Sequence, residues 1–189
     1  MIRFSFILTF LLALVNLSSA DAQDTCYLGS WEFDAAYTYE NGEYSPGGSM
    51  ASMPIEFTQA TGSAFLTFDN EGDFTYTFDS WSATFQSNTG PITTEVRVNL
   101  HGDVWGRYSP SGDTFLTMFM SGDGVPEPNI ESSTVIILAG RSMDGPDNFE
   151  SFFGPQTFGV EYRCEGDFLY INGESGGGAF RNSRYMRVN

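Results

Sequence analysis

Apolar and polar residues alternate with a period of two along most of this 189-residue chain, a pattern typical of strands with one buried face. The longest alternating run covers 31–40, where aromatic residues from Trp31 to Tyr39 share one face and acidic or hydroxyl residues occupy the other. Nine further runs are shorter, and several are less regular. The ten predicted strands lie at 31–40, 64–69, 74–78, 95–101, 104–108, 114–120, 134–138, 158–164, 168–172 and 185–188.

Turn-forming residues separate most of these runs, at Asn70-Glu71-Gly72, 109–112 and Asn172-Gly173. Strands with one dry and one wet face pair antiparallel and bury their dry faces together. The sequence therefore predicts an all-β fold, an antiparallel up-and-down β-barrel of about 8–10 strands in one domain over 23–189. Two runs, 114–120 and 136–138, are apolar on both faces, so we expect further structure to cover part of the outside.

Two segments break the alternation and predict one or two short capping helices. The stretch 147–150 resembles a capping box, and Phe149, Phe152 and Phe153 follow with the spacing of one helix face. A second turn is expected around Met50–Met53, before a proline. Each turn either closes one end of the barrel or covers a ligand as a lid.

The N-terminus has the features of a secretory signal peptide, assigned to 1–22. Arg3 is followed by a largely apolar stretch over 4–15 and then by small residues with an Ala-x-Ala cleavage site at Ala20–Ala22. The apolar stretch is too short to span a bilayer. We therefore expect a secreted protein, extracellular or periplasmic, without membrane insertion.

Two cysteines in an exported chain predict one disulfide, between Cys26 and Cys164. The bridge joins the start of the domain to a point near its end, and closing so long a loop stabilises a fold by about 5 kcal/mol. A metal site needs more histidine or cysteine ligands than this chain holds, because it has a single histidine. We expect no metal and no other cofactor.

Acidic residues dominate the charge. The 24 acidic residues outweigh the 8 basic ones, all arginine, and the net charge is −16. Such a charge repels phosphate backbones and anionic lipid surfaces, so nucleic-acid binding and peripheral membrane binding are excluded. The absence of lysine excludes Schiff-base chemistry. Strong self-repulsion also favours a monomer.

Short motifs resemble a known family. The first strand opens with Cys26 and a Gly29-x-Trp31 motif, and Thr67–Gly72 looks like a strand ending in an acidic turn. The segment 162–169 looks like a late hairpin carrying the second cysteine, and the last strand bears arginines. Together these resemble the secreted lipocalin-like, or calycin-type, β-barrel domains. The resemblance implies a structural role for Trp31 at the closed end of the barrel. Arg187, or Arg184, would cover its ring in a cation–π contact.

No catalytic constellation emerges from the sequence. His101 lies on the polar face of its predicted strand and is expected to be solvated, and no Gly-x-Ser-x-Gly elbow accompanies it. The many carboxylates leave a glycoside hydrolase open as an alternative, since the separation of acidic pairs is not visible in a sequence. Acidic turns at 69–73 and 144–147 leave calcium binding open. The leading expectation is a protein without catalytic activity.

The aromatic content directs the functional hypothesis, because an eight-stranded barrel has room for one small ligand. We expect an apolar or aromatic molecule inside, with the turn at Phe149–Phe153 as a lid. The alternative is a filled barrel that acts as a structural or surface-interaction module. A continuous interior void favours the first hypothesis and interlocked rings favour the second. The expected wall residues are Tyr76, Phe78, Val96, Val98, Phe115 and Tyr162.

Overall fold

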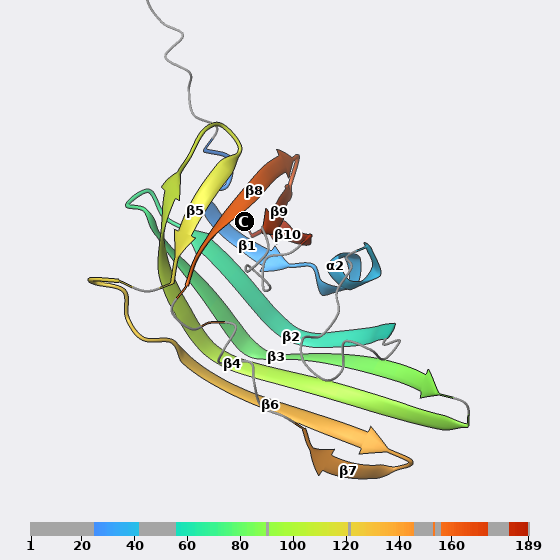
Figure 1. Cartoon of the computed structure of the whole chain (residues 1–189). Coiled ribbons are helices and arrows are strands. Elements are labelled where there is room, and N and C mark those ends of the chain that lie inside the picture. Colours follow the sequence, from blue (N-terminus) through green and yellow to red (C-terminus); the bar gives the residue numbers. More distant parts are fainter. Residues whose placement is uncertain are drawn as a thin grey trace, which may run out of the picture.

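The described part of the chain forms one antiparallel β-sheet and one short helix. The computed structural model describes residues 25–41, 56–89, 91–120, 122–145, 153, 156–173 and 182–188. Figure 1 labels the elements along the chain. They are β1 (Gly29–Phe33), α2 (Ala35–Asn41), β2 (Glu56–Phe68), β3 (Asp73–Thr89), β4 (Ile92–Pro110), β5 (Phe115–Phe119), β6 (Asn129–Leu138), β7 (Arg141–Asp144), β8 (Thr157–Glu165), β9 (Phe168–Gly173) and β10 (Ser183–Arg187).

Most of the strands form a ring of pairings, hereafter called the ring. The sheet order runs β3-β2-β1-β10-β9-β8-β5-β4, and β4 also pairs with β3, so the pairings return to their starting point. Every strand except β6 and β7 belongs to the ring, and its members follow one another in chain order. The β4–β5 contact is short, from Arg107↔Phe119 to Pro110↔Leu116. The all-β antiparallel fold is thus confirmed and is partly closed, while a complete barrel stays a prediction.

The second region is an open extension, hereafter called the arm. It consists of 56–63 of β2, 79–89 of β3 and 92–103 of β4, together with β6 and β7. β4 pairs with β6 from Thr94↔Leu138 to Asp103↔Asn129, so the free edge of β4 is divided between the arm and the ring. Figure 1 shows this long curved sheet sweeping away from the compact group of β1, β5, β8, β9 and β10.

A line of backbone irregularities marks the boundary between ring and arm. The β2–β3 register shifts at 61–63 and the β3–β4 register shifts at 78–81. Gly62 has φ +72°, and a Cβ there would lie 2.2 Å from the Ser80 carbonyl oxygen. Gly102 has φ +113°, and a Cβ would lie 2.0 Å from the Asn129 carbonyl oxygen. Glycine is required at both places, because β-bulges and close backbone approach leave no room for a side chain.

The largest of the fully buried side chains all come from the ring. Apolar residues of the inward faces fill its interior, as the alternation predicted. Among the described residues, none of these side chains comes from the arm. They are Trp31, Leu66, Phe68, Phe74, Val104, Leu116, Met118, Val160, Leu169, Ile171 and Tyr185.

The first predicted strand is wrong beyond Phe33. Asp34 ends β1, and its Oδ1 accepts a hydrogen bond from the Tyr37 backbone N–H at 3.0 Å, which caps the N-terminus of α2. The Thr38 backbone N–H donates to the Asp34 carbonyl at 3.0 Å, the first bond inside the helix. A helix forms here because Asp34 caps its N-terminus and the apolar residues that follow also fit a helical period.

Other boundaries differ as well. The runs predicted at 95–101 and 104–108 form one strand, β4, which continues through Gly102. β7 was not predicted, because all four of its residues are exposed and no alternation marks them. The turn expected at Met50–Met53, the signal peptide and most of the 147–153 helix lie outside the described residues. Among the residues that the structure describes, no helix is long and apolar enough to cross a membrane.

Candidate functional site

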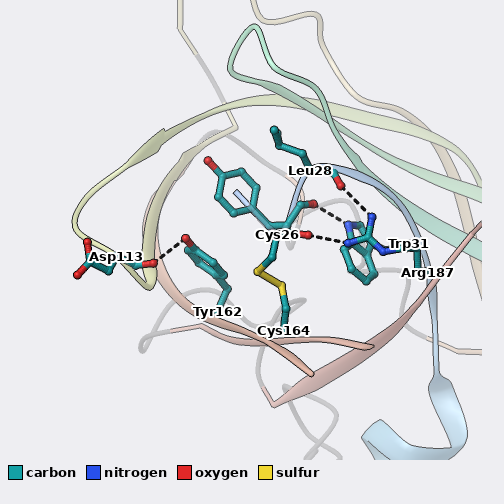
Figure 2. The surroundings of a disulfide bond; sticks show 8 residues. Cys26, Leu28, Trp31, Asp113, Tyr162, Cys164 and Arg187 are labelled. Atoms are coloured by element: carbon teal, nitrogen blue, oxygen red, sulfur yellow. Dashed lines mark hydrogen bonds between the residues drawn. A yellow bond between two sulfur atoms is a disulfide. The ribbon is translucent and has the colours of Figure 1, made fainter. Parts of the chain in front are cut away.

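The predicted disulfide between Cys26 and Cys164 is confirmed. Its Cα atoms are 6.2 Å apart, and it links residues separated by 138 positions. Figure 2 shows the bridge joining the segment before β1 to β8, with aromatic side chains on both sides. The bridge therefore fixes the beginning of the ring against one of its last strands.

Trp31 and Arg187 form the arrangement that the family resemblance implied. The indole of Trp31 is 0% exposed, and its Nε1–H donates to the Tyr27 carbonyl at 2.6 Å. The Arg187 guanidinium lies 4.1 Å from the Trp31 ring centroid and donates to the Cys26 carbonyl at 2.9 Å (Figure 2). Arg187 thereby ties β10 to the segment next to the disulfide across the face of the indole.

Interlocked aromatic side chains occupy the interior of the ring of strands beside the disulfide. The Tyr27 ring centroid lies 5.5 Å from that of Tyr108 and 4.9 Å from that of Tyr162, both in edge-on geometry. Phe68 packs edge-on against both Tyr27 and Tyr108, at 5.7 and 5.3 Å. The Tyr162 hydroxyl donates to the Asp113 carbonyl at 2.8 Å, and that of Tyr108 donates to the Asp69 carbonyl. Tyr108 and Tyr162 thus fill the interior with their aromatic side chains, while their hydroxyls form hydrogen bonds to backbone carbonyls.

A second aromatic cluster lies deeper, where the ring meets the arm. Tyr76 has its ring centroid 4.5 Å from that of Phe78 and 6.4 Å from that of Tyr185. Phe153 packs edge-on against Phe78 at 5.6 Å, and Trp81 lies 6.2 Å from Phe78. All five side chains are buried. This cluster continues the packed interior toward the arm.

The two buried tyrosines of this cluster, Tyr76 and Tyr185, have raised pKa values. Burial raises the pKa of the Tyr76 phenol well above its usual value, and the neighbouring Tyr185 raises it further. Burial also raises the pKa of Tyr185, partly opposed by the hydroxyls of Tyr76 and Ser183. Within the described part of the chain, the buried Tyr185 hydroxyl forms no hydrogen bond, although the hydroxyls of Tyr76 and Ser183 lie near enough to affect its pKa.

The predicted wall residues do not converge on one place. Tyr76, Phe78 and Phe153 belong to the deeper cluster, whereas Tyr162 packs beside the disulfide. Phe115 was assigned to the interior wrongly. It lies on the opposite face of β5 from the buried side chains at 116 and 118, and its strand is apolar on both faces, which hid the correct phase.

The remaining predicted wall residues lie on the arm. Val96 and Val98 are buried on β4, and Val96 stands in register with Phe85 and Ile136. Both valines therefore lie on the arm part of β4, away from the aromatic residues that pack beside the disulfide. The other predicted lid residues, Phe149 and Phe152, lie outside the described residues.

A cleft of about 560 Å³ opens on the outer side of β8, β9 and β10, and is hereafter called the tyrosine cleft. Its aromatic walls are Tyr37 of α2 and Tyr170 of β9, whose ring centroids lie 5.9 Å apart in edge-on geometry. Its full lining is Tyr37, Thr114, Glu161, Tyr162, Arg163, Tyr170, Ile171, Asn172, Asn182 and Ser183. One signal for this cleft is present in the sequence, the aromatic Tyr170 on the polar face of the run 168–172, but the alternation alone does not assign it to a site.

Arg184 holds Tyr37 in place at this cleft. Its guanidinium lies 3.6 Å from the Tyr37 ring centroid, and its Nε–H donates to Asp34 Oδ2 at 2.9 Å. Asp34 is the residue that caps α2, so one carboxylate both begins the helix and binds the arginine. Burial alone would lower the pKa of Arg184, but hydrogen bonds to Asp34 and Tyr170 raise it above its usual value. Arg184, the second arginine that the resemblance offered as a cover for Trp31, thus packs on Tyr37 instead.

A second cleft, of about 430 Å³, lies at the bend between ring and arm and is hereafter called the acidic cleft. Asp79, Asp103 and Glu131 line it together with Phe65 and the exposed His101. The Thr77 hydroxyl donates to Asp103 Oδ1 at 2.6 Å. Among the residues that the structure describes, no group of three or more histidine, cysteine or acidic side chains is arranged to hold a metal ion.

Comparison with known proteins returned no match to a protein family, a curated protein or a solved structure. The resemblance to lipocalin-like domains therefore stays a prediction. The contacts within the chain itself carry the functional argument.

Proposed function

We propose that this protein is a secreted, non-catalytic surface-interaction module built on a filled β-barrel. The observation that supports this function best is the packing of Tyr27 against Phe68, Tyr108 and Tyr162 in the ring interior. Aromatic side chains at these separations leave no continuous space between them for a ligand. The interior then serves stability, and recognition takes place on the outer faces.

The shape of the molecule supports the same function. The disulfide and the Trp31–Arg187 contact stabilise the ring, and Asp34, which caps α2, is attached to β10 through its ion pair with Arg184. The two clefts described above are lined mainly by half-buried and exposed residues. A rigid scaffold that presents outward clefts is the arrangement of a binding module rather than of a carrier.

A titration with an apolar fluorescent probe tests the filled interior. The oxidised full-length protein is titrated with N-phenyl-1-naphthylamine while the tryptophan fluorescence is followed. We expect no saturable, one-to-one quenching, because Trp31 is enclosed by packed side chains. One-to-one quenching at micromolar probe concentration would contradict the proposal and favour a ligand-binding barrel.

The second candidate function is binding of a small apolar or aromatic molecule in the interior. The buried Tyr185 hydroxyl favours it, since it forms no hydrogen bond within the described residues, such a group is costly, and a ligand with a hydrogen-bond acceptor would satisfy it. Mass spectrometry of small molecules extracted from natively purified protein tests this candidate. A stoichiometric molecule that is absent from a Tyr185→Phe preparation would support it, and recovery of the same molecule from both preparations would count against it.

A further inference from the structure

We propose that the tyrosine cleft binds a neutral saccharide. This inference rests on the proposed surface-interaction function and names the chemical class of its partner. Saccharides combine apolar C–H faces with a rim of hydroxyl groups. A protein site for them therefore needs aromatic surface, hydrogen-bonding side chains around it, and little net charge.

The aromatic surface of the cleft is held rigidly before any ligand arrives. Tyr37 is fixed on one face by Arg184, which is itself bound to Asp34. Tyr170 carries the Arg163 guanidinium 4.5 Å from its ring centroid and contacts Tyr37 edge-on. Both tyrosines are half-buried, so part of each ring faces the cleft. Binding to a site already held in shape costs less conformational entropy than binding to a mobile one.

Hydrogen-bonding groups surround these rings. Asn172 follows Tyr170 by two positions on the same outward face of β9 and stands opposite Glu161 of β8 in the register. Asn182 precedes β10 at the same edge of the cleft and has φ +49°. Asparagine offers both a donor and an acceptor, and a carboxylate offers acceptors only, so the set matches vicinal hydroxyl groups.

Charge favours a neutral ligand over an ionic one. Arg163 is paired with Glu165 at 3.2 Å, and Arg184 is paired with Asp34, so both cations already have counter-ions. The net charge of −16 repels an anionic ligand from the whole molecule. A cationic ligand would meet the Arg163 guanidinium beside the single carboxylate of Glu161. A neutral polyhydroxy molecule meets none of these penalties.

Calorimetric titration with neutral oligosaccharides tests the site. The probes are cellotetraose, maltotetraose, mannotetraose and chitotetraose, each titrated into the oxidised full-length protein. We expect saturable binding of at least one of them, about tenfold weaker in Tyr170→Leu and in Asn172→Ala. Asn172 is exposed, so its replacement leaves the fold intact even if Tyr170→Leu weakens α2 packing.

Two controls locate the binding. Tyr170→Phe keeps the ring and should retain most of the affinity, whereas Phe65→Leu in the acidic cleft should leave it unchanged. Failure of all four probes to bind at millimolar concentration would overturn the saccharide assignment, and the probe titration of the interior would still decide the filled module. Binding that is lost only in Phe65→Leu, or that survives both Tyr170→Leu and Asn172→Ala, would equally overturn it.

Discussion

The ring and the arm are made of the same strands but differ in how they bury side chains. Phe74 of the ring and Phe85 of the arm lie on the same strand, β3, and both are buried, yet the largest fully buried side chains all belong to the ring. Along the arm, exposure rises outward from Val96 through Ile136 to Met143, which is 48% exposed. Closure, and not strand length, therefore decides how well an antiparallel strand buries its apolar face.

The difference also separates stability from recognition. Stabilising contacts concentrate in the ring, where the disulfide, the Trp31–Arg187 contact and the interlocked tyrosines lie within one small region. The tyrosine cleft lies on the outer faces of ring strands and the acidic cleft at the bend. A rigid interior beneath polar outer faces allows the faces to vary without loss of the fold.

Loss of the disulfide should have the largest effect on this contrast. The paired change Cys26→Ser and Cys164→Ser should lower the free energy of unfolding by about 5 kcal/mol, because it frees a loop of 138 residues in the unfolded chain. Urea denaturation of the oxidised protein and the variant measures the difference. A loss below about 1 kcal/mol would mean that the ring does not depend on the bridge.

Removal of the central indole comes next. Trp31→Ala should destabilise by about 3–5 kcal/mol, since it leaves a cavity beneath Arg187 in a fully buried site. Denaturant unfolding of the variant measures this directly. If the variant were nearly as stable as the parent, the interior would not be packed around Trp31.

Alkaline pH should weaken the ring through its buried tyrosines. Both Tyr76 and Tyr185 have folded-state pKa values above the ordinary 10, so their contribution is complete below pH 10 and is lost as the pH rises above it. Each tyrosine should lower the free energy of unfolding by up to about 1.4 kcal/mol per pH unit above 10. The measurement is the stability between pH 8 and about 11.

Tyr185→Phe provides the control for that pH dependence. The variant has one fewer buried phenol, so its stability should fall less steeply above pH 10 than that of the parent. An identical slope in both proteins would show that Tyr185 ionises as easily when folded as when unfolded. Such a result would place its hydroxyl in contact with solvent.

A substitution on the arm should have the smallest effect. Met143→Ala should change the free energy of unfolding by less than about 0.5 kcal/mol, because the side chain is half exposed at the outer edge of the sheet. Urea denaturation measures this change, and Trp31→Ala serves as the matched variant with a large expected loss of stability. A loss of 2 kcal/mol or more, roughly that of a core residue, would show that the arm is packed like the ring.

The sequence predicted the ring better than the arm. Alternation identified β8 most clearly, because Phe158, Val160 and Tyr162 are buried and alternate with more exposed residues. On the arm, the bulge between Phe78 and Trp81 shifts the phase of β3, and the segment 56–63 has few apolar residues. Period-two reasoning has no signal where the phase shifts or the inner face is polar.

The tyrosine cleft could not be predicted for a different reason. Its walls come from Tyr37, which the sequence placed on a strand, and from Tyr170 on the polar face of β9. Those residues meet only because Asp34 ends β1 and begins α2, and because β10 returns beside β9. Such a meeting depends on long-range pairing, whereas the disulfide could be predicted from the two cysteines alone.

Amide hydrogen exchange tests the contrast between ring and arm most directly. In the oxidised full-length protein, the amides of β1, β9 and β10 should exchange slowest, with protection close to the global stability, and those of β6 and β7 should exchange through local opening at a much lower free energy. Equal protection in β6 and in β9, or faster exchange in β9, would contradict a filled and stable ring with an open arm.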